Sequence, residues 1–192
     1  CQWKVEGSDS PAFVKNITET DAGLSKAGYK TIGIAMCTGD ARSEDHGPWK
    51  MVGLMPMLDP PREDTKATIA SLNHANISVK MITGDHLNVG KETARLIGLG
   101  QDFHAGEEIR SANNPESRNE MIWNADGFAS VLPSDKREVV LTLKKEYGLV
   151  TGMTGDGVND APALSAAQVG IAVEGATDAA KNAADLILTE PG

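Results

Sequence analysis

The segment most diagnostic of this chain's architecture reads Thr154-Gly155-Asp156-Gly157-Val158-Asn159-Asp160. It follows a short apolar run at 149–153, so it lies where a strand would end. Its three carboxylate or carboxamide side chains, Asp156, Asn159 and Asp160, suit a hard cation such as Mg²⁺. Its glycines allow the backbone to come close to a ligand. A Gly/Asp turn that only caps the next helix would use the same residue types. The other polar segments of the chain are therefore needed to distinguish a cation site from a simple capping turn.

On both sides of this segment, short apolar stretches alternate with amphipathic ones. We expect strands at 78–82, 128–132, 149–153, 169–172 and 186–188. We expect helices at about 62–75, 86–98, 134–147, 160–167 and 176–184. This alternation predicts an α/β fold, with a mostly parallel sheet that carries helices on both faces. In such a sheet the chemistry lies at the edge where the strands end.

Two further polar clusters also follow predicted strands. Thr83, Gly84 and Asp85 come after the first strand, and Lys136 comes after the second, in the first turn of a helix. Thr83 and Gly84 can offer a hydroxyl and a backbone N–H to phosphate oxygens, while Asp85 orients a neighbour or caps the next helix. A lysine near a helix N-terminus opposes the helix dipole, which a bound phosphate would explain. The alternative for Lys136 is a solvated surface lysine.

The first part of the chain has a different pattern. A helical segment contains Phe13, Ile17 and Leu24, ends at Gly28, and is followed by strands at 31–36 and 49–55, which a polar loop at 38–48 connects. The sequence Asp59-Pro60-Pro61 then forms a stiff joint, because proline continues neither a helix nor a sheet ladder. We therefore expect one partial domain at 1–55 and a second domain at 56–192.

Composition narrows the classes of partner. The formal net charge is −9 over 192 residues, with a pI near 4.9, which disfavours nucleic acid and anionic membranes because both are polyanions. Two cysteines, Cys1 and Cys37, are too few for a disulfide framework or a zinc site. No apolar run approaches the roughly 18 residues of a membrane-spanning helix. The chain begins at Cys1 without an initiator Met, and we interpret it as a segment of a longer protein.

Taken together, the ordered motifs resemble those of P-type ATPases. Residues 154–164 resemble the hinge signature of that family, residues 59–62 and 81–85 resemble two further signatures, and Lys136 matches the phosphate-facing lysine of a proline-led motif. The amino-acid sequence is similar to that of the plasma-membrane proton-pump branch in segments 79–85, 90–93, 175–180 and 188–192. The resemblance implies a haloacid-dehalogenase-like Rossmann fold for residues 56–192, and it makes residues 1–55 the tail of a nucleotide-binding domain.

The resemblance also implies a mechanism in which Mg²⁺ and ATP phosphorylate an aspartate and water later removes the phosphate. Asp156 would coordinate Mg²⁺, with Asp160 as a second metal residue, and Asn159 and Asp160 would organise its waters and the phosphate. Thr83, Gly84 and Lys136 would neutralise the phosphoryl oxygens.

Three more residues acquire roles from the same resemblance. Arg62 would touch the nucleotide and Asp59 would help to form the hinge. Lys30 falls where the family more often has an arginine that reaches nucleotide phosphate; a lysine keeps the charge but loses the bidentate fork. The implied partners are ATP and the transmembrane, actuator and nucleotide-binding domains of the same pump. The implied location is the cytoplasmic side of a plasma membrane.

One motif of the family is absent from the sequence. The phosphorylated aspartate of P-type ATPases lies in an Asp-Lys-Thr-Gly-Thr segment, which does not occur here, so this chain cannot form the phosphoenzyme by itself. We expect the sheet to lack the strand that carries it. The alternatives are a pump for another cation, a soluble haloacid-dehalogenase-type phosphatase, and a non-catalytic module descended from a pump. The phosphatase would need a paired-aspartate motif on its first strand, and none is present.

Overall fold

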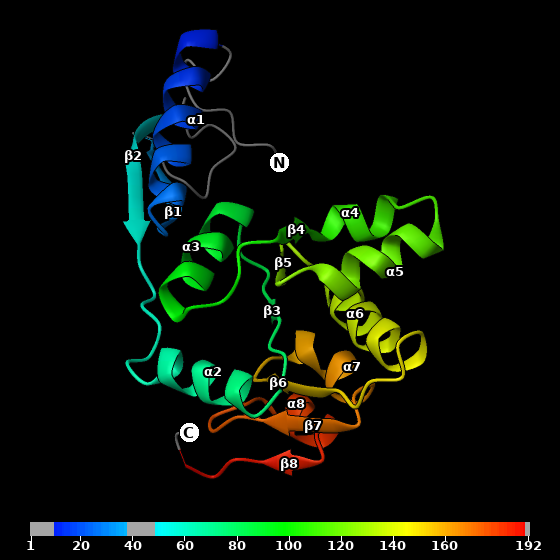
Figure 1. The fold of residues 1–192 in the computed structure, drawn as a ribbon. Helices are drawn as coiled ribbons and strands as arrows, with labels where there is room; N and C mark the ends of the chain where they lie inside the picture. Colours follow the sequence, from blue (N-terminus) through cyan, green and yellow to red (C-terminus); the bar gives the residue numbers. More distant parts are fainter. Residues whose placement is uncertain (1–9, 38–48, 191–192) are drawn as a thin grey trace.

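A computed structural model describes residues 10–37 and 49–190 of the chain (Figure 1). The first part contains α1 (Pro11–Lys26), β1 (Lys30–Met36) and β2 (Lys50–Met57), and the two strands pair antiparallel. Pro11 opens α1, where its missing N–H and fixed φ cost nothing. Gly28, at φ +87°, turns the chain from α1 into β1, as expected from the sequence. The predicted loop at 38–48 lies outside the described residues.

Two parallel sheets make up the rest of the described chain. The first has the order β3-β5-β4, from β3 (Met81–Ile82), β4 (Phe103–Ala105) and β5 (Gly127–Ala129). The second has the order β6-β7-β8, from β6 (Gly152–Gly155), β7 (Val169–Ala172) and β8 (Leu186–Ile187). The predicted mostly parallel α/β fold is confirmed, with β1 and β2 as the antiparallel exception. The strands form two three-stranded sheets instead of a single one.

The helices that follow β2 in the described chain are α2 (Thr65–His74), α3 (Leu87–Ile97), α4 (Gly106–Ser111), α5 (Pro115–Asn124), α6 (Pro133–Lys145), α7 (Ala161–Leu164) and α8 (Asp178–Ala183). Five of these helices lie where the alternation predicted them, whereas α4 and α5 lie outside the expected helix ranges. A short 3₁₀ turn, η1 (Val158–Asp160), precedes α7. Helix α6 follows β5 and packs against α7, which follows β6, so this helix pair joins the two sheets.

The hydrophobic core is divided between the two sheets, with a separate cluster beside each. Phe128 of β5 is fully buried and packs with Ile109, Ile122 and Val139, which come from α4, α5 and α6. Leu164 of α7 is fully buried in a second cluster with Ala172 of β7, Ala180 of α8 and Ala176 of the connection between them. Burying a side chain of Phe or Leu size contributes about 1.5–3 kcal/mol. Each sheet is therefore fixed to its own helices by apolar contact.

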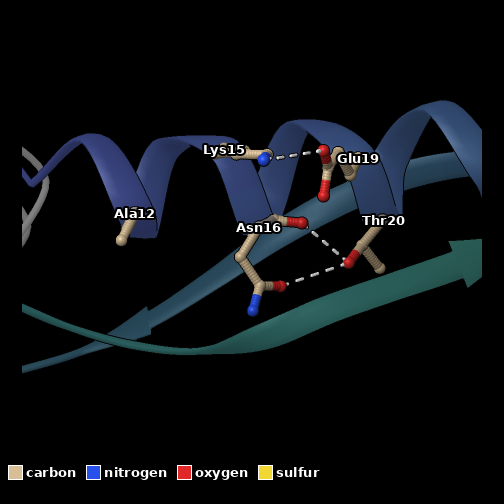
Figure 2. A pocket seen from close by; sticks show the side chains of 5 residues that line it. All are labelled: Ala12, Lys15, Asn16, Glu19 and Thr20. Atoms are coloured by element: carbon tan, nitrogen blue, oxygen red, sulfur yellow. Dashed lines mark hydrogen bonds and ion pairs between the residues drawn. The ribbon is translucent and has the colours of Figure 1, made fainter.

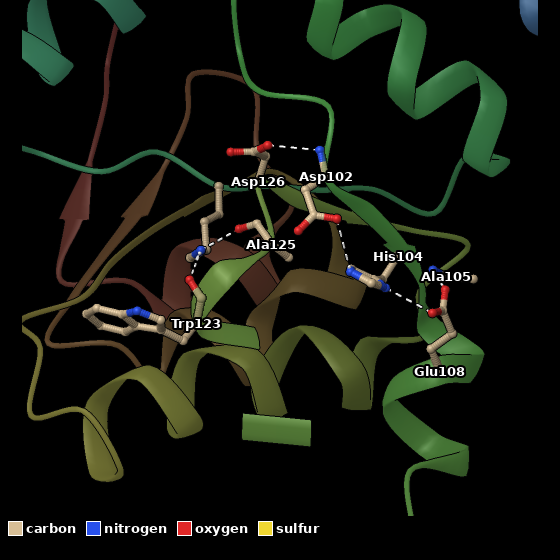
Figure 3. A network of polar contacts seen from close by, with 8 residues as sticks. Asp102, His104, Ala105, Glu108, Trp123, Ala125 and Asp126 are labelled. Atoms are coloured by element: carbon tan, nitrogen blue, oxygen red, sulfur yellow. Dashed lines mark hydrogen bonds and ion pairs between the residues drawn. The ribbon is translucent and has the colours of Figure 1, made fainter. Parts of the chain in front are cut away.

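The amino-terminal ends of β3, β4 and β5 are tied together by polar contacts (Figure 3). Lys80 donates hydrogen bonds to the carbonyl oxygens of Trp123 and Ala125, and the Asp126 carboxylate accepts one from the Asp102 N–H at 2.9 Å. Burial lowers the pKa of the Lys80 ammonium, although Asp126 and Asp102 partly oppose this. These contacts fix the register at the edge opposite to the predicted site.

No helix in the described ranges 10–37 and 49–190 is both long and apolar enough to cross a membrane. The connection between β2 and α2, residues 58–64, contains the Asp59-Pro60-Pro61 joint and no helix or strand. The boundary that we place there stays a prediction.

Gly127 is the position in β5 where a side chain is least tolerable. A Cβ there would lie 2.3 Å from Cζ of Phe103 and 2.5 Å from the carbonyl oxygen of Met81. We expect Gly127→Ala to lower the free energy of unfolding by about 1–3 kcal/mol through overpacking. Urea unfolding followed by circular dichroism measures this. The control is Gly53→Ala in β2, where a Cβ meets nothing within 4 Å; equal losses in both variants would contradict the packing argument.

Candidate functional site

The turn after β6 is held in shape by the buried side chain of Asp160. One carboxylate oxygen of Asp160, Oδ2, accepts hydrogen bonds from the backbone N–H groups of Asp156 (3.3 Å) and Gly157 (3.1 Å). A Cβ at Gly155 would lie 2.5 Å from Cβ of Asp160, so only glycine allows this approach. The loop is therefore closed on itself, with the Asp160 side chain 8% exposed.

Lys136 reaches this turn from the first sheet. It lies in the first turn of α6, and its Nζ donates a hydrogen bond of 2.6 Å to Oδ1 of Asp160. The Lys136 side chain is 15% exposed, so it is not the solvated surface lysine that we gave as the alternative. The structure thus brings together two of the sequence clusters, one after β5 and one after β6.

The pKa of Asp160 reflects these contacts. Burial raises the pKa of its carboxyl, but the hydrogen bond from Lys136, the N–H of Gly157, the charge of Lys136 and the N–H of Asp156 together lower it below its ordinary value. Asp160 is therefore ionised at neutral pH, and its charge compensates that of Lys136.

Asp156 and Asn159 are the exposed polar residues of the turn. Within residues 10–37 and 49–190 their side chains make no hydrogen bond or ion pair with protein, so the Asp156 carboxylate is free to take a ligand. In the same part of the chain no three His, Cys, Asp or Glu side chains gather as an all-protein metal site. Mg²⁺ usually binds through one or two carboxylates, waters and substrate phosphates, and Asp156 fits that pattern. Asp160 fits less well, because Oδ1 already holds Lys136 and Oδ2 holds two backbone N–H groups.

The loop after β3 carries the third cluster. The hydroxyl oxygen of Thr83 accepts a hydrogen bond of 3.1 Å from the Asp85 N–H, which leaves the hydroxyl hydrogen able to donate to a ligand. The Asp85 carboxylate does not cap α3, whose N-cap residue is His86. It pairs instead with Lys30 of β1, with 3.0 Å between Nζ and Oδ1. Gly84 is exposed.

Backbone contacts join this loop to the segment that leads into α6. The Ser130 N–H donates to the carbonyl oxygen of Asp85 at 2.7 Å, and the Val131 N–H donates to that of Thr83 at 3.3 Å. The loops after β3 and β5 therefore lie side by side. No hydrogen bond or ion pair among the described residues links the Thr83–Asp85 loop directly to Asp156 or Asp160, so a shared ligand for all three clusters stays a prediction.

The remaining predicted residues lie apart from this cluster. Asp59 and Arg62 are exposed in the connection before α2, and Nε of Arg62 is 3.8 Å from the carboxylate of Asp64. A surface pocket on α1, lined by Ala12, Lys15, Asn16, Glu19 and Thr20, contains none of the predicted residues (Figure 2). No sequence motif pointed to Arg110, which forms an ion pair with the buried carboxylate of Asp135 beside Lys136.

The Lys136–Asp160 pair makes stability depend on pH. Because the folded pKa of Asp160 is below the unfolded value of about 3.9, its contribution is present above that pH and is lost as the pH falls through the folded pKa. We expect Asp160→Asn to lower the free energy of unfolding by about 1–3 kcal/mol at pH 7. The difference from wild type should shrink below about pH 4.

Urea unfolding at pH 7 and at pH 3.5 tests this expectation. Asp156→Asn is the matched control, since it removes an exposed carboxylate of the same turn that has no partner among the described residues. A difference between Asp160→Asn and wild type that is the same at both pH values would contradict it.

Comparisons with known proteins place the chain among relatives. Residues 30–168 match the family model of the haloacid dehalogenase-like hydrolases. Over 98% of its length the chain is 44% identical to the plasma membrane ATPase of Dunaliella bioculata, of which it covers 18%. It is 41% identical, over 93% of its length, to plasma membrane ATPase 1 of Saccharomyces cerevisiae and to the plasma membrane ATPase of Kluyveromyces lactis, of which it covers 19% and 20%.

The chain thus spans about a fifth of the length of these curated relatives. The resemblance to the plasma-membrane branch of the P-type ATPases is confirmed by these matches. The haloacid-dehalogenase-like fold that the resemblance implied is likewise confirmed by the family match and the parallel sheets. This chain belongs to the haloacid dehalogenase-like hydrolase family.

Proposed function

We propose that this chain is the phosphate- and magnesium-handling segment of an ATP-driven pump of the proton-exporting branch, working by formation and hydrolysis of an aspartyl phosphate. The observation that carries the proposal is the buried contact of 2.6 Å between Nζ of Lys136 and Oδ1 of Asp160, beside the exposed carboxylate of Asp156. It sets a fixed cation and a free carboxylate at one turn. A phosphoryl group with bound Mg²⁺ needs both of these partners.

The residues divide the work as follows. Lys136 neutralises charge on the phosphoryl oxygens, and Asp160 keeps its ammonium in place. The Thr83 hydroxyl and the Gly84 N–H donate to the other oxygens. Asp156 would hold Mg²⁺, which would supply positive charge against the phosphoryl group. Asn159, exposed in the same turn, orders water around it.

The phosphorylated aspartate comes, in this proposal, from a strand in another part of the same protein. Among the described residues β3 pairs only with β5, and β6 pairs only with β7, so β3 and β6 each lie at an edge of their sheet. A parallel strand between β3 and β6 would satisfy both edges and unite the two sheets. Its carboxyl end would then lie between the loops that carry Thr83 and Asp156.

The first part of the chain would belong to the nucleotide-binding domain of the parent. In support, Ile32, Ile34 and Met55 lie on one face of the β1–β2 pair and are 41–46% exposed, which suits a face that more of the same domain covers. Lys30 now pairs with Asp85, and ATP phosphates would compete for that ammonium. Arg62 would contact the nucleotide near the Asp59 hinge.

The proton is proposed from the branch-specific segments and from similarity to plasma membrane ATPases. The ion ligands would lie in membrane helices of the parent, which would be located in the plasma membrane. This segment would lie on the cytoplasmic side of that membrane. A pump for another cation would use the same phosphate site.

Asp156→Asn in the full-length parent tests the proposal. We expect phosphoenzyme labelling from radioactive ATP to fall at least about 100-fold, because the amide cannot replace the anionic Mg²⁺ ligand. The control is Glu116→Gln, an exposed carboxylate in the first turn of α5, which should label normally. Near-normal labelling of correctly folded Asp156→Asn protein would contradict the proposal.

A further inference from the structure

Asp135 is a buried carboxylate next to the site that the proposed mechanism does not use. Its side chain is 3% exposed and lies at the third position of α6, one residue before Lys136. It accepts hydrogen bonds from Nη1 of Arg110, from the backbone N–H of Leu132 at 2.8 Å and from the Ser134 hydroxyl at 3.4 Å. Burying a carboxylate costs desolvation free energy, which these donors offset. A buried group that needs so many partners is expected to have a specific role.

The position of this carboxylate is tightly defined. A Cβ at Gly106, the first residue of α4, would lie 2.7 Å from Oδ2 of Asp135, so the helix start is in close contact with the carboxylate. Arg110 reaches it from the next turn of α4. Helix α4 therefore acts as a support against which the first turn of α6 is fixed.

The three residues between β5 and α6 are constrained along their whole length. Ser130 has φ +51°, a left-handed conformation that is uncommon for a residue with a Cβ. The N–H groups of Ser130 and Val131 donate to the carbonyl oxygens of Asp85 and Thr83, and that of Leu132 donates to Asp135. All three backbone donors are thus occupied, and Asp135 holds the end of the connection nearest to Lys136.

We propose that Asp135, supported by Arg110, is a positioning residue that sets the location of the Lys136 ammonium. The Lys136 N–H donates to the carbonyl oxygen of Leu132 at 3.3 Å, so the residue that Asp135 fixes is also the one that anchors the Lys136 backbone. Without Asp135 the first turn of α6 can shift, and Nζ of Lys136 no longer stays at Asp160. This inference rests on the proposed phosphoryl role of Lys136.

The test uses the full-length parent and five variants, of which four, including the control, test the role of Asp135. Asp135→Asn removes the charge, Asp135→Glu restores a carboxylate that can reach back to the helix start, and Arg110→Gln leaves the Leu132 contact in place. Glu138→Gln is the matched control, because Glu138 lies on the same helix and pairs with Arg118 at 3.1 Å, away from the Ser130–Leu132 connection. We measure kcat per phosphorylatable molecule, KM for ATP and the thermal unfolding midpoint.

We expect Asp135→Asn to lower kcat by about 10–100-fold with KM for ATP changed less than about twofold, since misplacement by an ångström has effects of this size. Asp135→Glu should recover most of that loss. Arg110→Gln should lower kcat by about three- to tenfold. A purely structural role would lower the unfolding midpoint while kcat per folded molecule stayed at the level of Glu138→Gln, and that result would overturn the inference.

Lys136→Ala separates this inference from the proposed function. If Lys136→Ala still forms phosphoenzyme at a normal rate, the proposed function itself fails. If Lys136→Ala is inactive but Asp135→Asn turns over like Glu138→Gln, only the positioning role fails. Should Asp135→Asn not fold, Arg110→Gln decides the question, and an unchanged kcat in that variant overturns the proposal.

Discussion

The charge pair of Lys136 and Asp160 is the interaction on which the rest of the site depends. Lys136 lies in α6, which follows β5 of one sheet, and Asp160 follows β6 of the other sheet. The pair therefore spans the junction between the two sheets. Both side chains are largely removed from water, which costs desolvation free energy that each offsets for the other. Backbone N–H groups of the turn satisfy the remaining oxygen of Asp160. The junction is therefore polar and rigid where a phosphoryl group would need it.

Close backbone approach makes this arrangement possible. Gly155 lets Asp160 fold under the turn after β6, and Gly106 lets α4 reach the carboxylate that precedes Lys136. The left-handed Ser130 turns the chain sharply between β5 and α6. Fixed dipoles and charges stabilise a transition state better than mobile ones, since they need no reorganisation during the reaction. The packing thus connects the sequence motifs to the proposed chemistry.

The sequence predicted the features that depend on local pattern. Strand and helix alternation predicted the parallel α/β fold, and two of the three polar clusters that follow strands meet where Lys136 contacts Asp160. It missed β4 and α4, because β4 contains one large apolar residue, Phe103, and α4 has only six residues, too few to show a helical period. It also missed the Arg110–Asp135 pair and the Lys30–Asp85 pair, because residues 25 and 55 positions apart meet only through tertiary packing. The division into two sheets is likewise a property of strand pairing, which no single segment encodes.

The most direct measurement is a structure of the full-length parent with Mg²⁺ and a phosphate mimic such as beryllium fluoride. We expect Nζ of Lys136, the Thr83 hydroxyl and the Gly84 N–H each to lie within hydrogen-bond distance, about 2.7–3.2 Å, of one bound group. We also expect the Asp156 carboxylate to reach the metal beside that group. A mimic bound to Asp156 with Thr83 and Lys136 directed elsewhere would contradict this expectation.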